Sequence, residues 1–414
     1  MNLVFEDLQN YRNLTACTDL IPANEEEPES FRFGTTNLVH LLQFNGVQID
    51  LYSVEDRPDR YIFAVNGYVS PDFWACHQSE SAQFTTSPFD HIPAPVLDDL
   101  RAGKALILFE TLWEGFEYRE IYGWWHREAY RLGINRRNIG HINGAITEKR
   151  CYESWCAANG ESPESLMIGE SYFQHLTVRK WFDPAQFVTF DEQIAYKRTY
   201  MGKIKLYNCL NRRPHPHREL MACKLFDHGL LPQGLVSCDT IRHFDHLVGH
   251  GISTDTIDSI SNLLPLVLDD SDFNCNKAVN FKREFYLDSW VSVINETLAG
   301  DGNQVFLSEK IWKPVLARHP FMIWGNPKSL EIMRELGYKT FDGLLDESYD
   351  QKGYVDRAQG IIDNLVNLRD TDLMDWFERC RDICEHNYEN LMANVSKLSP
   401  AVQKLMDRYD QLGV

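Results

Sequence analysis

The chain has 414 residues, of which 43% are hydrophobic and 24% are charged, a length and composition typical of a globular protein with two domains of roughly 150–200 residues each. With 41 basic against 60 acidic residues, its formal net charge is −19, which argues against broad, nonspecific attraction to a nucleic acid or an anionic membrane. The sequence has no run that approaches the roughly 20 apolar residues of a membrane span.

The start of the chain and its cysteines bear on the cellular compartment. The first residues, MNLVFEDLQNYRN, contain neither a basic region nor an apolar run, so we expect no secretory signal. Ten cysteines are scattered without a CxxC pair, which favours free thiols in a reducing compartment. We therefore expect a cytoplasmic protein.

The first half of the chain predicts short strands, followed by alternating strands and helices. Residues 31–70 contain the alternating runs VQIDLYSV and YIFAVNGYV, which favour β-hairpins. The apolar run KALILFE at 104–110 predicts a strand that is buried on both faces. The pattern then indicates a helix over 122–134, a strand near 138–146 and a helix over 149–160. This strand-helix-strand-helix order predicts a parallel, doubly wound sheet.

A second series of strands and helices begins near residue 201. KIKLYNCL at 203–210 predicts a strand, 211–218 a turn and 219–231 a helix. The other elements that we expect in this series are strands at 234–238, 290–297, 320–325 and 339–341, and helices at 308–317, at 326–338 and over much of 355–414.

These two series determine the predicted domain organisation. The fold class is α/β, with two Rossmann-like domains in tandem and a set of C-terminal helices. We place the boundary near 195–202, so that residues 1–200 form an N-terminal domain and residues 201–414 form a C-terminal domain with a helical tail.

The segment LYNCLNRRPHPHR places Arg212, Arg213 and Arg218 between a predicted strand and a predicted helix. Ligands of open α/β sheets lie beyond the carboxyl ends of the strands, and the N-terminus of a helix offers free backbone N–H groups there. Guanidinium groups match phosphate oxygens in both charge and geometry. The segment therefore predicts a diphosphate site, and the alternative is a solvated basic turn.

A second candidate segment is NQVFLSEKIWKPVLARHPFMIWGNP at 303–327. Ser308 suits the N-cap of a helix, Glu309 and Lys310 fall in its first turn, and Lys313 follows one turn later. Here a carboxylate can accept hydrogen bonds from ribose hydroxyls, and a lysine can meet phosphates. The alternative is that Glu309 only complements the helix dipole.

The wider segment FLSEKIWKPVLARHPFMIWGNPKSLEIMRELGYKTFD resembles the donor-binding segment of glycosyltransferases with two Rossmann domains, the GT-B architecture. It is particularly similar to a fucosyltransferase-like signature, in which T/S-E-K and a helix precede a Pro-hydrophobic strand that ends in Gly. With LNRRPHPHR and GLLPQGLVS upstream, it also resembles uncharacterised glycosyltransferases of phages and giant viruses. The resemblance covers residues 203–345.

The resemblance implies a hexosyl- or pentosyltransferase whose C-terminal domain binds a UDP- or GDP-sugar as the donor and whose N-terminal domain binds the acceptor. By motif match, Glu309 and Lys310 contact the ribose and the phosphates, and Arg212 or Arg213 contacts the diphosphate. The acceptor domain of the fucosyltransferases is not recognisable in this sequence, so their sugar, acceptor and base are not carried over.

The chemistry of glycosyl transfer suggests what else to look for. The reaction passes through an oxocarbenium-like state, and an inverting enzyme uses a carboxylate to deprotonate the acceptor hydroxyl. Glu110 and Glu114, in FETLWEGF, lie at the end of the predicted strand 104–110 and are the candidate bases; the alternative is a loop carboxylate without a catalytic role. The arginines and lysines can neutralise the leaving diphosphate, so the sequence requires no metal.

The acceptor stays open at this point. The viral resemblance suggests the hydroxymethyl group of a modified pyrimidine in phage DNA, with the protein in the host cell cytoplasm. A glycan or a lipid-linked sugar is the alternative acceptor. A protein that binds a nucleotide sugar without catalysis is a different kind of function, whereas the lack of a GxGxxG after a first strand disfavours a dinucleotide-dependent enzyme.

Two other patterns bear a partial likeness to metal sites. His243, His246 and His250 lie at helix-like intervals, but no cysteine or carboxylate arrangement completes a zinc site. The acidic run LDDSD at 268–272 lacks the Gly hinge and the ligand series of a calcium loop. We therefore expect hydrogen-bonded or exposed histidines and an acidic surface loop.

Overall fold

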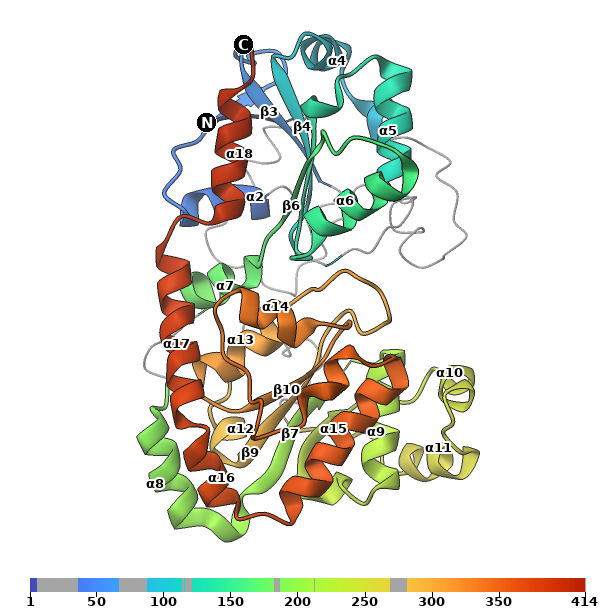
Figure 1. Cartoon of the computed structure of the whole chain (residues 1–414), viewed down its shortest axis with the longest axis vertical. Helices are drawn as coiled ribbons and strands as arrows, with labels where there is room; N and C mark the ends of the chain where they lie inside the picture. The colour runs from blue at the N-terminus through green and yellow to red at the C-terminus, as the bar shows by residue number, and fades with distance from the viewer. Residues whose placement is uncertain are drawn as a thin grey trace. The chain divides into compact units, whose positions relative to one another are not determined.

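The computed structural model describes residues 1–5, 36–66, 88–113, 115, 121–181, 187–211, 213–268 and 281–413. The chain divides into two compact units, of which unit 1 comprises Met1–His175 with Val395–Val414, and unit 2 comprises Leu176–Asn394 (Figure 1). Each unit is built on one parallel sheet with helices around it. The predicted α/β class, with two such units in tandem and helices at the C-terminal end, is confirmed.

The sheet of unit 1 has six parallel strands in the order β2-β1-β3-β4-β5-β6. The strands are β1 (Asn2–Phe5), β2 (Asp50–Ser53), β3 (Tyr61–Asn66), β4 (Ala105–Thr111), β5 (Ile139–Asn143) and β6 (Leu166–Gly169). The helices are α2 (Thr36–Phe44), α4 (Ala94–Arg101), α5 (Ile121–Leu132), α6 (Glu148–Asn159) and α18 (Pro400–Asp410), and α7 (Tyr172–Leu176) follows β6.

The predicted β-hairpins at 31–70 are wrong. Both β2 and β3 pair with β1 in parallel, so that Leu3 lies opposite Leu51 on one side and Ile62 on the other. Part of the segment forms helix α2, while residues 31–35 and 67–70 lie outside the described ranges. Side chains alternate with a period of two in parallel and antiparallel strands alike, so the alternation indicated strands without revealing their partners.

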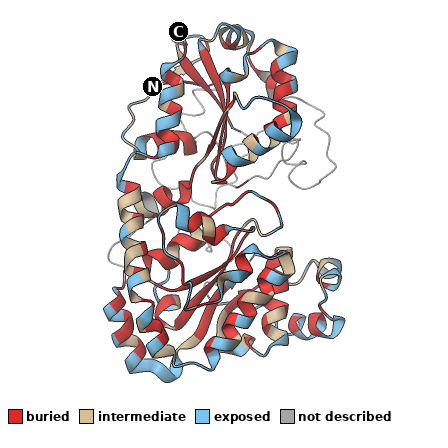
Figure 2. Ribbon diagram, in the orientation of Figure 1, coloured by how far each residue is buried: buried red, intermediate tan, exposed pale blue. Residues whose placement is uncertain are grey.

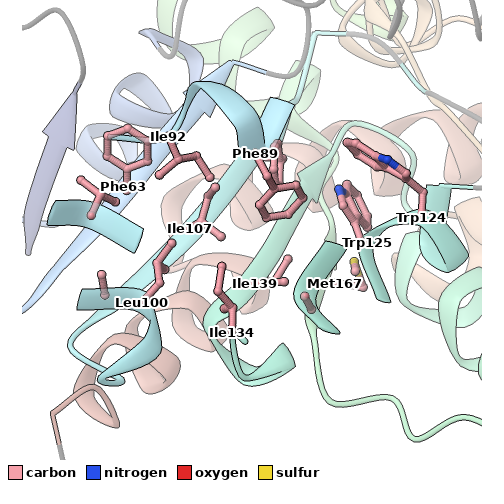
Figure 3. Close-up of a cluster of buried hydrophobic side chains, with 14 of the residues drawn as sticks. Phe63, Phe89, Ile92, Leu100, Ile107, Trp124, Trp125, Ile134, Ile139 and Met167 are labelled. Atoms are coloured by element: carbon pink, nitrogen blue, oxygen red, sulfur yellow. The ribbon is translucent and has the colours of Figure 1, made fainter. Parts of the chain in front are cut away.

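The core of unit 1 lies around β4, whose seven residues are all buried (Figures 2 and 3). Phe109 of β4 stacks on Trp125 of α5 with ring centroids 5.5 Å apart, and its edge meets Phe89 at 5.4 Å. A strand covered on both faces needs apolar side chains throughout. This burial explains the continuous apolar run that the sequence shows at 104–110.

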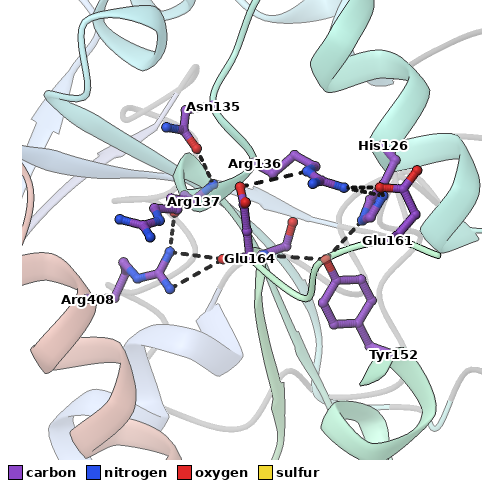
Figure 4. A network of polar contacts seen from close by, with 9 residues as sticks. His126, Asn135, Arg136, Arg137, Tyr152, Glu161, Glu164 and Arg408 are labelled. Atoms are coloured by element: carbon purple, nitrogen blue, oxygen red, sulfur yellow. Dashed lines mark hydrogen bonds and ion pairs between the residues drawn. The ribbon is translucent and has the colours of Figure 1, made fainter. Parts of the chain in front are cut away.

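The C-terminal helix α18 belongs to unit 1, whereas the prediction placed residues 201–414 in one domain. Val402 and Leu405 of α18 are fully buried, and the helix packs against β6. At its C-terminal end the Arg408 guanidinium donates hydrogen bonds to the backbone carbonyls of Arg137 and Glu164 (Figure 4). These contacts between distant parts of the chain leave no local pattern in the sequence.

The prediction placed residues 1–200 in the N-terminal domain, but the segment from Leu176 onward belongs to unit 2. Helix α8 (Phe190–Tyr200) buries the Lys197 side chain, whose ammonium donates to the carbonyls of Tyr286 at 2.8 Å and Leu287 at 2.9 Å. Burial lowers the pKa of Lys197 well below its usual value. The backbone carbonyls provide the acceptors that a buried lysine needs.

The sheet of unit 2 has four parallel strands in the order β10-β9-β7-β8. The strands are β7 (Lys205–Asn211), β8 (Gly234–Cys238), β9 (Ser289–Asn295) and β10 (Phe321–Trp324). The remaining helices are α9 (Pro216–Asp227), α10 (Phe244–Gly249), α11 (Thr254–Ser261), α12 (Glu284–Leu287), α13 (Glu309–Leu316), α14 (Ser329–Glu335), α15 (Tyr354–Arg369), α16 (Leu373–Arg379) and α17 (Arg381–Ser396).

Two details of unit 2 bear on the predictions. The predicted strand at 339–341 is wrong, because these residues form no strand and only an isolated bridge joins Asp342 to Leu345. The strand order places β7 between β8 and β9, so the chain leaves β7 toward one side and returns on the other. Such a reversal is the place where open α/β sheets bind ligands.

In the described ranges, we find no helix with the length and apolar character that crossing a membrane requires.

Gly169, at the end of β6, tests the packing of unit 1. A Cβ atom at this position would lie 2.2 Å from the Ile146 carbonyl oxygen and 2.5 Å from that of Ala145. We expect Gly169→Ala to lower the free energy of unfolding by about 1–3 kcal/mol because backbone atoms must move, as measured by urea denaturation. Gly202→Ala is the control, since no atom lies within 4 Å of a Cβ there; an equal loss in both variants would contradict the prediction.

Candidate functional site

Two segments that are distant in the sequence meet at the carboxyl ends of β7 and β9. The strand-end side chains Asn211 and Asn295 are joined by a hydrogen bond of 2.8 Å from Nδ2 of Asn295 to Oδ1 of Asn211. Just beyond them, the His217 ring donates from Nε2 to the Glu296 carbonyl oxygen at 2.8 Å. The predicted arginine segment therefore lies beside the segment that leads to Ser308 and Glu309.

Helix α9 starts earlier than predicted, and this brings charged residues to its N-terminus. It begins at Pro216 rather than at residue 219, because proline suits the first position of a helix, where its missing N–H is not needed. His217 and Arg218 consequently lie in the first turn, and both are 6% exposed. A first turn at the carboxyl edge of the sheet adds free N–H groups and partial positive charge to the site.

Arg218 is a buried cation without an ion-pair partner in the described part of the chain. Its Nε atom is buried and forms no hydrogen bond with the described residues, and among them its one hydrogen bond is from Nη1 to the Arg213 carbonyl oxygen at 3.5 Å. Burial lowers its pKa, although Glu309 and Glu296 act in the opposite direction. Because an uncompensated buried charge is costly, this geometry points to an anion from outside the chain.

The residue before the helix, His215, occupies the N-cap position, but its side chain does not cap the helix. The ring is half-buried. Burial is the main cause that lowers its pKa to about 4, followed by the positive charges of Arg218, Lys310 and Arg213. The imidazole is therefore neutral at physiological pH in the free protein.

Ser308 and Glu296 determine how helix α13 begins. Ser308 caps the helix by accepting the Lys310 backbone N–H at 3.3 Å, and its own N–H and hydroxyl both donate to the Glu296 carboxylate. The Lys310 ammonium bonds to Ser308 Oγ at 3.0 Å and to Thr297 Oγ1 at 3.1 Å. The lysine is thereby held at the end of β9, and it also pairs with the neighbouring Glu309 carboxylate at 3.3 Å.

The two acids of this segment differ in character. Glu309 is 16% exposed. Its burial alone would raise its pKa, but Lys310 and Lys313 outweigh this effect and lower the pKa, so Glu309 is an ionised acceptor. Glu296 is fully buried, and burial raises its pKa. Glu296 was not among the predicted site residues, although its position near the end of the predicted strand at 290–297 was a usable signal.

The structure thus brings most of the predicted donor residues together at one edge of the sheet of unit 2. Arg213 is exposed, and its charge acts on His215. Lys313 is half-buried, and its charge acts on Glu309. Arg212 lies outside the described residues. The residues that lie at this edge are Arg213, Arg218, Ser308, Glu309, Lys310 and Lys313, together with the unpredicted His215, His217 and Glu296.

The first candidate base, Glu110 of β4, is fully buried. One carboxylate oxygen accepts the Leu112 N–H at 2.7 Å and the Asn37 amide at 3.5 Å, while Oε2 is buried and has no hydrogen-bond partner within the described ranges. Burial raises the pKa of Glu110 to about 8. The group is therefore mostly protonated at neutral pH, and its role as a base stays a prediction. Glu114 lies outside the described residues.

A hydroxyl-imidazole-carboxylate chain lies close to Glu110 but on the opposite face of the sheet. The His141 ring donates from Nδ1 to Glu148 at 3.0 Å, and its Nε2 accepts from the Thr111 hydroxyl at 2.7 Å. The order of groups is that of an acyl-transfer triad. All three side chains are at most 1% exposed, so no substrate reaches the hydroxyl, and the chain joins β4, β5 and α6 structurally.

The histidines near α10 form ordinary hydrogen bonds, as expected. His243 contacts Glu219 at 2.8 Å, His246 contacts the Tyr354 hydroxyl at 3.2 Å, and His250 contacts a carbonyl of its own helix at 2.7 Å. Within the described ranges, no group of three or more His, Cys, Asp or Glu side chains is arranged to hold a metal ion. Residues 269–272 of the acidic run lie outside those ranges.

Comparisons with known proteins give no family assignment: no family model matches the chain, and no curated protein matches it. Solved structures that resemble it include an α,α-trehalose-phosphate synthase (UDP-forming) from Burkholderia vietnamiensis, at 10% identity and a TM-score of 0.42, with 99% of this chain and 97% of that chain covered. A glycosyltransferase from Rickettsia africae is 11% identical, with a TM-score of 0.44 and coverage of 99% and 97%.

A third structure is the UDP-GlcNAc 2-epimerase from Neisseria meningitidis bound to UDP-GlcNAc. It is 11% identical, with a TM-score of 0.35 and coverage of 99% of both chains. All three likenesses extend over nearly the whole chain, and all are distant in sequence and in backbone.

The raised pKa of Glu110 predicts how stability depends on pH. In the folded protein the pKa of Glu110 is about 8, whereas its ordinary value is 4.5. Between these two pH values unfolding releases a proton, so the free energy of unfolding falls as pH rises through this window. Glu110→Gln is neutral at every pH. We expect it to be more stable than the wild type by a few kcal/mol at about pH 8, with a smaller difference at about pH 5.

Urea denaturation at the two pH values provides the measurement. Glu389→Gln is the control, because Glu389 is exposed and its loss should not produce a stability gain that grows with pH. A difference between Glu110→Gln and the wild type that is the same at both pH values would show that Glu110 has no raised pKa.

Proposed function

We propose that this protein is a glycosyltransferase that binds the diphosphate of a nucleotide sugar at the carboxyl edge of the unit 2 sheet. The observation that carries the proposal is Arg218, a buried guanidinium without an ion pair among the described residues, at the start of α9. It lies where the strand order reverses, between the ends of β7 and β9. The position suits a ligand, and the unpaired charge requires that ligand to be an anion.

The surrounding charges support a diphosphate rather than a neutral ligand. Arg213 and Lys310 add positive charge near Arg218, since both act on the pKa of His215. The N-terminus of the 12-residue helix α9 contributes N–H donors. Guanidinium forks bind phosphate oxygens in pairs, so several donors are available for two phosphate groups.

The start of α13 offers a group that suits the nucleoside part of the donor. Glu309 is an ionised acceptor at the first helical position, which suits the two hydroxyls of a ribose. The fucosyltransferase-like resemblance implies the same role for Glu309 and a phosphate contact for Lys310. We therefore propose a UDP- or GDP-sugar as the donor, carrying a hexose or a pentose.

The same cations supply what the reaction needs at the leaving group. When the bond to the sugar breaks, negative charge develops on the diphosphate, and fixed positive charges stabilise it without a metal. We assign the acceptor to the N-terminal part of the chain, with Glu110 or Glu114 as the base. The acceptor is the hydroxymethyl group of a modified pyrimidine in phage DNA or, alternatively, a glycan or lipid-linked sugar, and we place the reaction in the cytoplasm, that of the host cell for a viral protein.

One observation favours a second function, the binding of a nucleotide sugar without transfer. Glu110 is fully buried and mostly protonated at neutral pH, and a base must be ionised and in reach of the acceptor hydroxyl. If Glu114 does not supply the base either, the donor site stays intact while the chemistry is lost.

The donor site is tested by Arg218→Met, a change that removes the charge and keeps much of the side-chain length. Since a buried unpaired charge destabilises the folded state, we expect the free variant to be at least as stable as the wild type. In thermal-shift measurements with UDP-, GDP- and CMP-sugars, we expect one nucleotide to stabilise the wild type and this stabilisation to be lost in the variant.

Arg369→Met is the matched control, because Arg369 is exposed at the C-terminal end of α15. It should leave nucleotide stabilisation unchanged. A wild type that no nucleotide sugar stabilises would contradict the proposed donor site, and so would an Arg218→Met variant that is less stable than the wild type yet binds equally well.

Transfer itself is tested with the donor identified in that screen. Incubation with hydroxymethylated DNA and, separately, with glycan acceptors should yield a glycosylated product with one class, detected by mass spectrometry. We expect Lys310→Met to lower the rate by roughly 100-fold or more, because one positive charge at the leaving group is lost. Tight donor binding without any product would favour the non-catalytic function.

A further inference from the structure

His215 is the residue of the proposed donor site whose imidazole has no hydrogen-bond partner among the described residues. It stands directly before α9 and leaves the helix end uncapped. Its neighbour His217 lies with its ring centroid 5.8 Å away, but that ring is buried and bonds to the Glu296 carbonyl oxygen. Of the two histidines in the HPH sequence, only His215 has both ring nitrogens free of hydrogen bonds to the described residues.

Among the described residues, the side chains with the largest effects on the pKa of His215 are cations and another imidazole. Arg213 precedes it in the same loop, Arg218 comes from α9, Lys310 from α13 and His243 from the segment before α10. With burial as the largest effect, these neighbours lower the pKa of the ring to about 4. The acids of the site, Glu296 and Glu309, act on Arg218.

We propose that His215 takes up a proton when the donor diphosphate binds, and that the resulting imidazolium contacts the diphosphate and stabilises it as the leaving group. This inference rests on the proposed function, and it adds a named residue and a bound proton to the donor site.

The physical reason is that a diphosphate reverses the charge around the ring. At an effective dielectric constant near 20, one negative charge at about 4 Å raises the pKa of an imidazole by about three units. Applied to His215, this moves its titration from about 4 to about 7. Binding the donor near neutral pH must then draw a proton from the solvent, and the free energy of binding includes that uptake.

The proton also has a place in the reaction. During transfer, the bond between the anomeric carbon and the diphosphate oxygen breaks, and its electron pair stays on that oxygen. The acceptor oxygen forms the new bond to the anomeric carbon and gives its proton to the base. An imidazolium next to the diphosphate adds a positive charge where negative charge accumulates, and His215 returns its proton to the solvent when the nucleoside diphosphate leaves.

Calorimetric titration tests the inference, with UDP-glucose and GDP-mannose as the probes. Both phosphates of these donors are esterified, so the probes themselves do not titrate near neutral pH. We expect the wild-type affinity to rise about tenfold or more from about pH 7.5 to about pH 5.5, and we expect His215→Gln to show less than about a twofold change. Titrations in buffers with different ionisation enthalpies should show net proton uptake by the wild type only.

His228→Gln is the matched control, because His228 lies at the opposite end of the same helix and is exposed. It should keep the wild-type dependence on pH. Thermal unfolding of each variant without ligand establishes that it is folded, and proton uptake by the wild type can be measured independently of any variant.

The outcomes separate this inference from the proposed function. Wild-type binding that Arg218→Met abolishes but that involves no proton uptake would overturn the role of His215 and leave the donor site standing. The role of His215 would also be overturned if His215→Gln kept the wild-type pH dependence of binding, or if His228→Gln lost that pH dependence. If neither probe binds the wild type at either pH, the donor site itself fails, and the inference fails with it.

Discussion

The reversal of strand order beside β7 is the constraint on which the rest of unit 2 depends. The chain leaves β7 for β8 on one side, and β9 lies on the other. The segments that follow β7 and β9 therefore both start at the carboxyl edge of the sheet. The bond from His217 to the Glu296 carbonyl and the bond between Asn295 and Asn211 hold these segments at a fixed separation. The charged first turn of α9 and the N-cap of α13 are therefore oriented by the sheet itself, and a ligand does not need to bring them together.

The charge of this edge is opposite to that of the chain as a whole, which is −19. Charges farther away than about 8 Å are largely screened at physiological salt, so an anion at the sheet edge is governed by the groups next to it. Arg218 shows the strength of this local bias, because an acidic chain has many carboxylates and yet pairs none of them with this guanidinium in its described part. The net charge of the chain bears on its attraction to nonspecific charged partners, and it does not exclude a local cationic site.

Features with a local signal could be predicted from the sequence, and features that depend on contacts between distant segments could not. The buried strand at 104–110 and the segments around Arg218 and Ser308 are visible as an apolar run and as two motifs, and the structure contains them close to the expected positions. The packing of α18 on β6 depends on which surface remains uncovered after the sheet forms, and no pattern within 400–410 reports it. The same holds for β2 and β3, whose alternation is compatible with either strand direction.

The two units suggest why a carboxylate at the end of the most apolar strand is a poor guide to a ligand-facing group. β4 and β9 are each buried along their whole length, and Glu110 and Glu296, at their carboxyl ends, are fully buried as well. Each accepts a backbone N–H of a nearby residue, Leu112 and Ser308 respectively, so each fixes the course of the chain beyond its strand. In unit 2 the groups available to a ligand come instead from the loop and the helix after β7, the strand at the reversal, and from the first turn of α13. By the same order, the reversal in unit 1 lies between β1 and β3, one strand away from Glu110, and strand order therefore does not single out Glu110 as a ligand-facing group.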